Sequence, residues 1–382
     1  MLRQFLTLTA GEGAARVCHG LALFLLARSV GPASFGQFGI VQSIAGYASL
    51  LVQRGLDVPA TRAVIAAPES APALRSAVLA LRWPVASVLT LAAIVWQDPM
   101  LIAACGIWIA AAFQMRWLLV ARDRSAAAAV AAVMAAVVLL AGVVAKLPLL
   151  WVVLALSVGE LAGAFVCWVA ARGPMESDAA VNASLRKESW WFLAAIVLGN
   201  LMYNLDVFIL AAVRPKEDTG LYVAAYRLVT VFSPVLGAMQ MSALPAFSHV
   251  RASGGNAGAL ARPVAIKGAS LASGAALLLW FSAPLLIAAV YGAAFASSEL
   301  LLRVLSLALP VQTARMVFRQ ALLAYGGERA DVWNLLIAVT VNGAIDLAFV
   351  PSFGAAACAV STVVAESVYA VLTWRAWRRA CA

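Results

Sequence analysis

The stretch "ARSVGPASFGQFG", residues 27–39, decides how this chain folds. It places Gly31, Pro32, Gly36 and Gly39 within nine positions between two apolar runs. Glycine tolerates positive φ, and proline fixes φ and lacks an N–H, so a cluster of both interrupts regular structure. We therefore predict a turn between two apolar segments here, and the next question is whether the chain contains a second such turn.

Composition indicates that these segments lie in a membrane. Of 382 residues, 64% are hydrophobic and 12% are charged, about half the charged share of an ordinary soluble domain. Apolar runs of about 20 residues recur along the chain, which is the length a helix needs to span a bilayer. We predict an all-α polytopic membrane protein with about 12 transmembrane helices, near 9–29, 37–56, 76–96, 99–120, 125–146, 149–171, 190–212, 220–247, 268–290, 298–322, 331–350 and 354–374.

The basic residues predict how these helices are oriented. With 12 spans both termini share one side, and that side collects 20 of the 27 Lys and Arg residues, against four on the other side. Cytoplasmic connections are enriched in Lys and Arg, so we expect both termini to be cytoplasmic in a bacterial inner membrane. The net charge of +10 is then explained by topology and by attraction to anionic lipid, and no nucleic-acid partner is expected.

A second turn follows half a chain later. In "RPKEDTGLYVAAYRL", Gly220 and Tyr222 answer Gly36 and Phe38 at an offset of 184. Two further matches, Pro59 with Pro245 and Glu160 with Glu366, keep the same order. Six-span repeats insert in one orientation and place a substrate site between two lobes. We predict an N-terminal lobe over 1–175, a cytoplasmic linker over 176–189 and a C-terminal lobe over 190–382.

Ionisable side chains inside a bilayer are costly, so each is a candidate functional residue. Arg16 shares a helix face with Glu12 and His19; a Glu12–Arg16 pair and a cationic stripe lining a cavity both remain open. Asp206 and Arg227 flank the second turn at similar depth, which favours a structural pair within the hairpin.

Other polar positions extend this set. Asn200 and Asn204 lie one helical turn apart and suit either sugar hydroxyls or helix–helix contacts. Arg303 lies inside the predicted periplasmic end of its span, whereas Arg315 and Arg319 are expected to reach the lipid headgroups. Arg28 lies on the side poor in basic residues, as a headgroup anchor or as part of an outer gate.

The acidic residues within or at the ends of spans are candidates for ion coupling or gating. Asp57 lies beside Arg54 at the end of a span and predicts either a cytoplasmic gate pair or an interfacial ion pair. Glu160, Asp346 and Glu366 could exchange protons during transport or form structural pairs.

Enzyme signatures are absent from the sequence. There is no GxxxxGK[ST], GxSxG or HExxH motif, the two histidines are isolated, and the five cysteines have no metal-binding spacing. We expect no catalytic residues, no metal and no cofactor apart from a possible H⁺ or Na⁺ coupling ion. A transporter is therefore the default expectation.

Three stretches carry a resemblance to a known family. "LLARSVGPASFGQFGIVQSIAGYASLLVQRGLDVPATRAVI", "NLDVFILAAVRPKEDTGLYVAAYRLV" and "VNGAIDLAFVPSFGAAACAVSTVVAE" occur in this order. They resemble helices one and two, seven and eight, and eleven and twelve of bacterial polysaccharide transporters. These belong to the multidrug, oligosaccharidyl-lipid and polysaccharide exporter superfamily. The resemblance implies two six-helix lobes in a MATE-like V shape, with alternating access.

It also implies a cargo. Wzx-type O-antigen flippases of this family translocate undecaprenyl-diphosphate-linked oligosaccharide for surface polysaccharide synthesis (O-antigen, capsule or exopolysaccharide). Arg16, Arg54, Arg227 and Arg303 could then hold the diphosphate, Asn200 and Asn204 the glycan, and membrane lipids the tail. Other polysaccharide-assembly proteins are possible partners. The alternatives are an antiporter of small organic cations and a membrane-embedded polymerase or glycosyltransferase.

Overall fold

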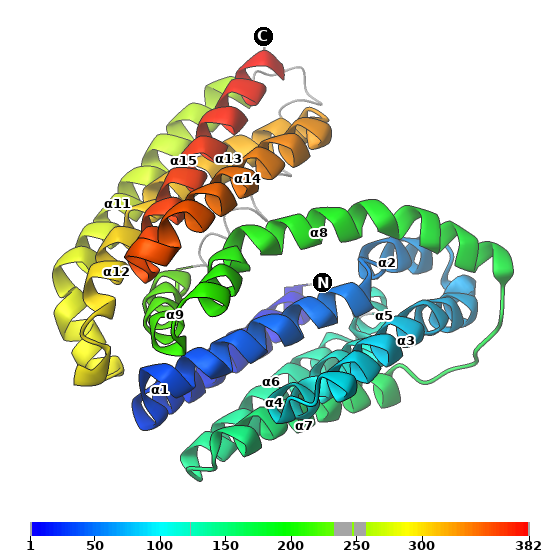
Figure 1. The fold of residues 1–382 in the computed structure, drawn as a ribbon. Coiled ribbons are helices and arrows are strands. Elements are labelled where there is room, and N and C mark those ends of the chain that lie inside the picture. Colours follow the sequence, from blue (N-terminus) through cyan, green and yellow to red (C-terminus); the bar gives the residue numbers. More distant parts are fainter. Residues whose placement is uncertain (1, 123, 233–246, 248–256, 381–382) are drawn as a thin grey trace. The chain divides into compact units, whose positions relative to one another are not determined.

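The computed structural model describes residues 2–122, 124–232, 247 and 257–380. Every regular element within these residues is a helix (Figure 1). The later part of the predicted span 220–247, together with Pro245, lies outside the described residues. The fold class predicted from composition, an all-α protein built from long apolar helices, is confirmed.

The helices form two compact units, one made of residues 1–30 and 40–200 and the other of residues 31–39 and 201–382. The predicted boundaries of 1–175, 176–189 and 190–382 place the division earlier. Residues 179–213 form one continuous helix, α8, which passes from the first unit into the second near Asn200. The short segment 31–39 also packs with the second unit, although it lies in the first half of the sequence.

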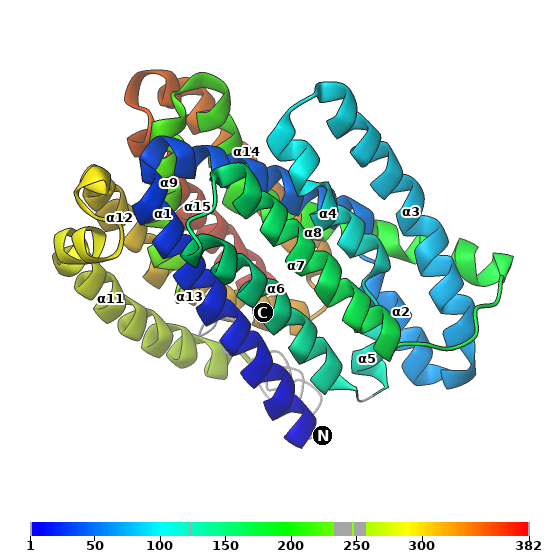
Figure 2. The ribbon, with the colours of Figure 1, turned by 90° about the horizontal axis from the view of Figure 1, so that it is seen from below.

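In the first unit, α6 packs against α7 and α7 packs against α4, and these helices lie side by side in Figure 2. Asp98 starts α4: its Oδ1 accepts hydrogen bonds from the backbone N–H groups of Met100 (2.8 Å) and Leu101 (3.2 Å). The helices of this unit are α1 (Leu2–Gln53), α2 (Asp57–Ala66), α3 (Ala71–Trp96), α4 (Pro99–Phe113), α5 (Arg116–Ala121), α6 (Ser125–Val144), α7 (Leu149–Ala170) and the first part of α8 (Ala179–Val213).

In the second unit, α14 and α15 pack together and α13 packs against both α11 and α15 (Figure 1). The break between α12 and α13 divides the predicted span 298–322 into two helical pieces. The helices of this unit are α9 (Lys216–Thr230), α11 (Ala257–Val290), α12 (Ser298–Ser306), α13 (Ala308–Ala324), α14 (Glu328–Phe353) and α15 (Ala355–Ala380).

Within the described residues, ten helical segments are long and apolar enough to cross a membrane. The first, Ala10–Ala66, covers two predicted spans, because α1 continues through the predicted turn with a kink. Gly31 has φ 76° and ψ 174°, a backbone conformation that suits glycine, and Pro32 follows it inside the helix. The quoted stretch therefore bends a helix instead of ending it.

Gly36 and Gly220 meet each other inside the second unit. A Cβ on Gly36 would lie 1.8 Å from the Lys216 carbonyl oxygen, and a Cβ on Gly220 would lie 1.9 Å from the Pro32 carbonyl oxygen. Lys216 follows Pro32 by the same offset of 184 that relates the two glycines. The two contacts are reciprocal, as two copies of one segment make across a two-fold axis. This reciprocity supports the predicted repeat.

Candidate functional site

Asp206 of α8 lies in a buried polar cluster in the second unit. Its Oδ2 accepts hydrogen bonds from the Tyr222 hydroxyl of α9 and from Thr362 Oγ1 of α15, the latter at 2.9 Å. Tyr222 and Thr362 also contact each other through their hydroxyl groups at 3.1 Å. Asp206 therefore ties three helices together.

A second acid, Asp346 of α14, lies beside it. Ser361 Oγ donates to Asp346 Oδ1 at 2.5 Å, and Asn342 Nδ2 donates to Ser361 Oγ at 3.1 Å. One ligand atom each from Asp206, Asp346 and Cys358 lies within 4.8 Å of the others. We call Asp206, Asn342, Asp346, Ser361 and Thr362 the carboxylate cluster.

The carboxylate cluster has acceptor capacity that its own donors do not use. Among the described residues, the buried atoms Asp206 Oδ1, Asp346 Oδ2 and Asn342 Oδ1 have no hydrogen-bond partner. Buried polar atoms are normally satisfied, and two buried carboxyl groups need positive charge to offset their own. Oxygen ligands suit a proton or a hard cation, whereas the Cys358 thiol suits softer metals.

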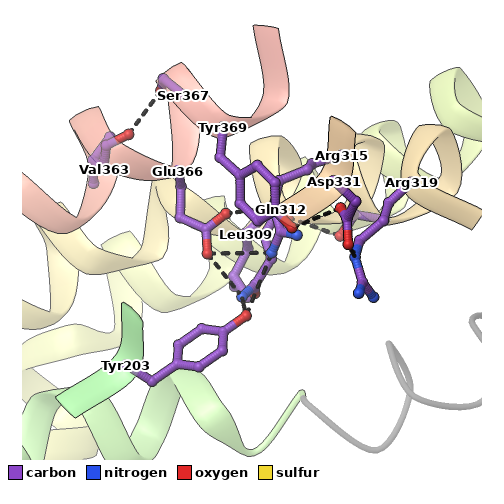
Figure 3. A network of polar contacts seen from close by, with 11 residues as sticks. Tyr203, Leu309, Gln312, Arg315, Arg319, Asp331, Val363, Glu366, Ser367 and Tyr369 are labelled. Carbon is purple, nitrogen blue, oxygen red and sulfur yellow. Dashed lines mark hydrogen bonds and ion pairs between the residues drawn. The ribbon is translucent and has the colours of Figure 1, made fainter. Parts of the chain in front are cut away.

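Arg315 of α13 and Glu366 of α15 form a buried ion pair (Figure 3). Arg315 Nε lies 2.7 Å from Glu366 Oε2, and the two side chains are 4% and 2% exposed. The Arg315 guanidinium carbon lies 4.3 Å from the centre of the Tyr369 ring. Tyr203 of α8 accepts hydrogen bonds at its hydroxyl from Arg315 Nη2 (3.4 Å) and Gln312 Nε2 (3.2 Å).

Arg319 continues this network at the next turn of α13 (Figure 3). Its Nε lies 3.0 Å and 2.8 Å from the two carboxylate oxygens of Asp331, and the Tyr369 hydroxyl donates to the same carboxylate at 2.9 Å. The prediction that Arg315 and Arg319 reach lipid headgroups is therefore wrong, because buried acids of α15 and α14 hold both. Glu366 is likewise a structural partner of Arg315.

Arg227 and Arg303 are also held within the second unit. The Arg227 guanidinium lies 5.6 Å from the centre of the Phe35 ring, so the first repeated segment contacts the second here as well. The structure gives Asp206 hydroxyl partners, which corrects the predicted Asp206–Arg227 pair. Arg303 Nε donates to the Trp280 carbonyl oxygen at 3.2 Å.

In the first unit, Glu12 forms its ion pair with Arg116 of α5, not with Arg16. Arg16 is exposed, and His19 Nε2 lies 3.3 Å from Gln42 Nε2. The predicted Glu12–Arg16 pair is therefore wrong. A tertiary partner far away in the sequence is nearer to Glu12 than its neighbour one helical turn along.

Asp57 also has a different partner from the one predicted. Its Oδ1 lies 2.5 Å from Nη2 of Arg82, whose side chain is fully buried, and Arg54 lies elsewhere, beside α8. Arg82 Nη1 also donates to the Gln114 carbonyl oxygen at 2.9 Å. Gln114 has an extended backbone where α4 ends, so Arg82 satisfies a carbonyl group that the helix leaves open.

The remaining candidates are dispersed. Glu160 is half-buried on α7, and Arg28 is exposed on α1. Asn200 donates to the Ile196 carbonyl oxygen of its own helix at 2.9 Å, and Asn204 lies one turn further along α8. The structure thus brings together Asp206 and Asp346 among the predicted acids. Sequence reasoning missed Tyr203, Gln312, Asn342 and Thr362, for which the only signal was a polar residue inside an apolar span.

The long apolar helices and the buried polar clusters between them define the class of this molecule. It is a multi-pass membrane protein of the transporter and flippase type. Residues 1–251 match the model of the family described as "Polysaccharide biosynthesis protein". The chain belongs to this family. No curated protein matches the chain.

Solved structures with the same fold include two kinds of transporter. "Lipid II flippase MurJ, inward closed conformation" has a TM-score of 0.77 at 12% identity and covers 96% of this chain and 86% of its own. An inward-facing multidrug resistance MATE transporter of the MOP superfamily has a TM-score of 0.76 at 12% identity, covering 95% and 94%. A MOP transporter from Pyrococcus furiosus has a TM-score of 0.65 at 13% identity, covering 99% and 95%. These are folds of transporters and flippases rather than of enzymes.

Proposed function

We propose that this protein is a flippase for undecaprenyl-diphosphate-linked oligosaccharide. It would move this lipid from the cytoplasmic to the periplasmic leaflet by alternating access, for the synthesis of a surface polysaccharide. The observation that carries the proposal is the match of residues 1–251 to the polysaccharide biosynthesis family. The resemblance in fold to a lipid II flippase supports it, because that protein also acts on a lipid-linked substrate.

The cargo carries two phosphates, a glycan and a polyprenyl tail, and each part needs different chemistry. Arginine binds phosphate oxygens by paired, charge-assisted hydrogen bonds, so Arg16, Arg227 and Arg303 are the proposed diphosphate ligands. The amides of Asn200 and Asn204 would bind sugar hydroxyls. The polyprenyl tail can stay in the lipid bilayer.

Energy coupling is proposed at the carboxylate cluster. Its unpartnered oxygens can take up a proton or a sodium ion, and Asp206 and Asp346 come from two different helices of the second unit. Binding a cation there would draw α8 and α14 together, and its release would separate two acidic groups. Asp57 and Glu366 are held in ion pairs, so they are not assigned to this role. Glu160 stays a candidate for it.

The proposed setting is a bacterial inner membrane with both termini in the cytoplasm. The asymmetry of 20 to four basic residues between the two predicted sides supports this orientation. Other polysaccharide-assembly proteins would supply the cargo on one side and use it on the other.

A deletion strain tests the proposed function. A cell that lacks this protein, but keeps the rest of its glycan locus, should accumulate the lipid-linked repeat unit on the cytoplasmic leaflet and lose surface glycan. Re-expression of the wild type should restore the glycan, whereas Arg303→Ala at equal protein level should not. Normal surface glycan in the deletion strain would count against the proposal.

A second candidate is an antiporter of small organic cations, which the resemblance in fold to MATE transporters favours. An antiporter of cations should bind its cargo with acids, yet the predicted cargo residues are mainly arginines. Drug sensitivity of the deletion strain, with surface glycan intact, would support the antiporter over the flippase.

A further inference from the structure

A basic cavity lies in the first unit, apart from the polar clusters described above. Its volume is about 680 Å³, and it lies between the end of α1 and the first three turns of α8. The residues that line this cavity, called the α8 pocket below, are Arg54, Ala179, Asn182, Ala183, Arg186, Lys187 and Trp190.

The sequence of α8 explains why these side chains face the same way. The lining positions recur at spacings of three and four, which places them on one face of the helix. Val181 and Leu185 lie on another face and pack into the hydrophobic core of the first unit. The first turns of α8 are therefore amphipathic, with the apolar side anchored and the basic side open.

The turn after α1 brings the third cation to this face. Gly55 has φ 64°, and a Cβ on it would lie 2.7 Å from Phe192 Cβ, so the turn packs directly against α8. Arg54 precedes this contact and therefore lies beside the basic face. Sequence separation of more than 130 residues hides this arrangement from any motif search.

The charges of the α8 pocket have one sign. Arg54, Arg186 and Lys187 line it together with no acid, and none of the three forms an ion pair with another described residue. Asn182 adds a neutral hydrogen-bond donor, and Trp190 is 62% exposed at the rim. Tryptophan and basic residues together are typical of the headgroup level of a membrane, and clusters of Lys and Arg bind anionic lipid there.

We propose that the α8 pocket binds the phosphate of an anionic lipid headgroup. Arg54 and Arg186 would contact the phosphate oxygens, Lys187 would add a third positive charge, and Trp190 would lie among the upper acyl carbons. This site does not depend on the nature of the cargo. A bound lipid would fix the start of α8, the helix that connects the two units.

Lipid retention by the purified full-length protein tests the proposal. The probes are phosphatidylglycerol and phosphatidylcholine, titrated in detergent and counted by native mass spectrometry. The test variant is Arg54→Gln/Arg186→Gln/Lys187→Gln. Each cation near a membrane surface contributes about a fivefold factor, so this variant should bind phosphatidylglycerol on the order of a hundredfold more weakly. Phosphatidylcholine binding should not change.

The matched control removes three other exposed cations from one helix, as Arg375→Gln/Arg378→Gln/Arg379→Gln at the end of α15. It should bind phosphatidylglycerol like the wild type. Equal weakening in both triple variants, or equal binding in the wild type and the pocket variant, would overturn the proposal. If the triple variant is not recovered folded, Lys187→Gln alone should show the fivefold loss, and no loss there would have the same negative meaning.

Inorganic phosphate separates the two possible sources of the bound group. Thermal stabilisation of the wild type by phosphate, absent in the pocket variant, would show that a soluble phosphate is recognised. Stabilisation by phosphatidylglycerol alone would assign the α8 pocket to lipid.

Discussion

Replacing Gly36 by alanine tests the contact between the two repeated segments. The added Cβ would lie 1.8 Å from the Lys216 carbonyl oxygen and 2.7 Å from the Gly220 nitrogen. An ordinary contact begins at 3.4 Å, so the first separation must grow by about 1.6 Å. Both neighbours are backbone atoms, and a rotamer change offers no relief.

The expected cost follows from overpacking. Inserting one carbon into a closely packed site costs about 1–3 kcal/mol, and a rigid backbone neighbour places Gly36→Ala near the upper limit. Alanine recovers up to about 1 kcal/mol because it favours the helix over glycine. The net loss should be about 2 kcal/mol, which lowers the melting temperature by several degrees.

Thermal unfolding of the purified protein in detergent measures this difference. Gly20→Ala is the matched control, since it lies in the same helix and a Cβ there meets nothing within 4 Å. It should be neutral or slightly stabilising. Gly220→Ala should resemble Gly36→Ala, because its Cβ would lie 1.9 Å from the Pro32 carbonyl oxygen.

The double variant sharpens the test. Both new Cβ atoms push the same two backbone segments apart, so the second substitution should cost less than the first, by more than about 0.5 kcal/mol. If Gly36→Ala melts with Gly20→Ala, or if the two costs simply add, the close reciprocal contact is refuted.

Two further substitutions probe the buried charges of the second unit. Glu366→Gln leaves the buried Arg315 without its counter-charge and should cost about 3–5 kcal/mol of stability in thermal unfolding, whereas Arg319→Gln, whose side chain is 31% exposed, should cost clearly less; equal losses would contradict the burial argument. Asp346→Asn should abolish sodium- or proton-stimulated transport and radioactive sodium binding, while the exposed Glu328→Gln control on α14 should preserve both; unchanged cation dependence in Asp346→Asn would remove the carboxylate cluster from the coupling mechanism.

Local patterns in the sequence predict much of the fold. Apolar runs of membrane-spanning length predict the long helices, and the offset of 184 between Gly36 and Gly220 predicts that two segments correspond. That these two glycines touch each other does not follow from the offset. It depends on where the two segments cross, which is a tertiary property.

The partners of the buried charges were largely unpredictable. Neighbours on one helix face suggested Glu12 with Arg16, and proximity in sequence suggested Asp57 with Arg54. The observed partners, Arg116 and Arg82, lie 104 and 25 residues away. Such pairs are set by how helices pack, and a sequence offers several acids and bases of equal merit for each.

The start of α8 shows a signal that could have been found. The polar residues between 176 and 189 suggested a linker, yet Val181 and Leu185 are spaced by four and form the apolar stripe that anchors a helix. Asp178 caps this helix through the backbone N–H groups of Ala180 (2.8 Å) and Val181 (3.2 Å). An amphipathic helix at the surface of a membrane reads as a polar loop when only its charges are counted.

Flipping by the purified protein tests the proposed function most directly. The protein is reconstituted into liposomes that carry a fluorescent undecaprenyl-diphosphate-linked oligosaccharide in both leaflets, and a membrane-impermeant quencher is added outside. Protein-dependent access of the inner-leaflet label to the quencher is predicted, with slower flipping by Arg303→Ala and Arg227→Ala at equal reconstitution. Access no faster than in protein-free liposomes, from protein that remains folded, would contradict a flippase.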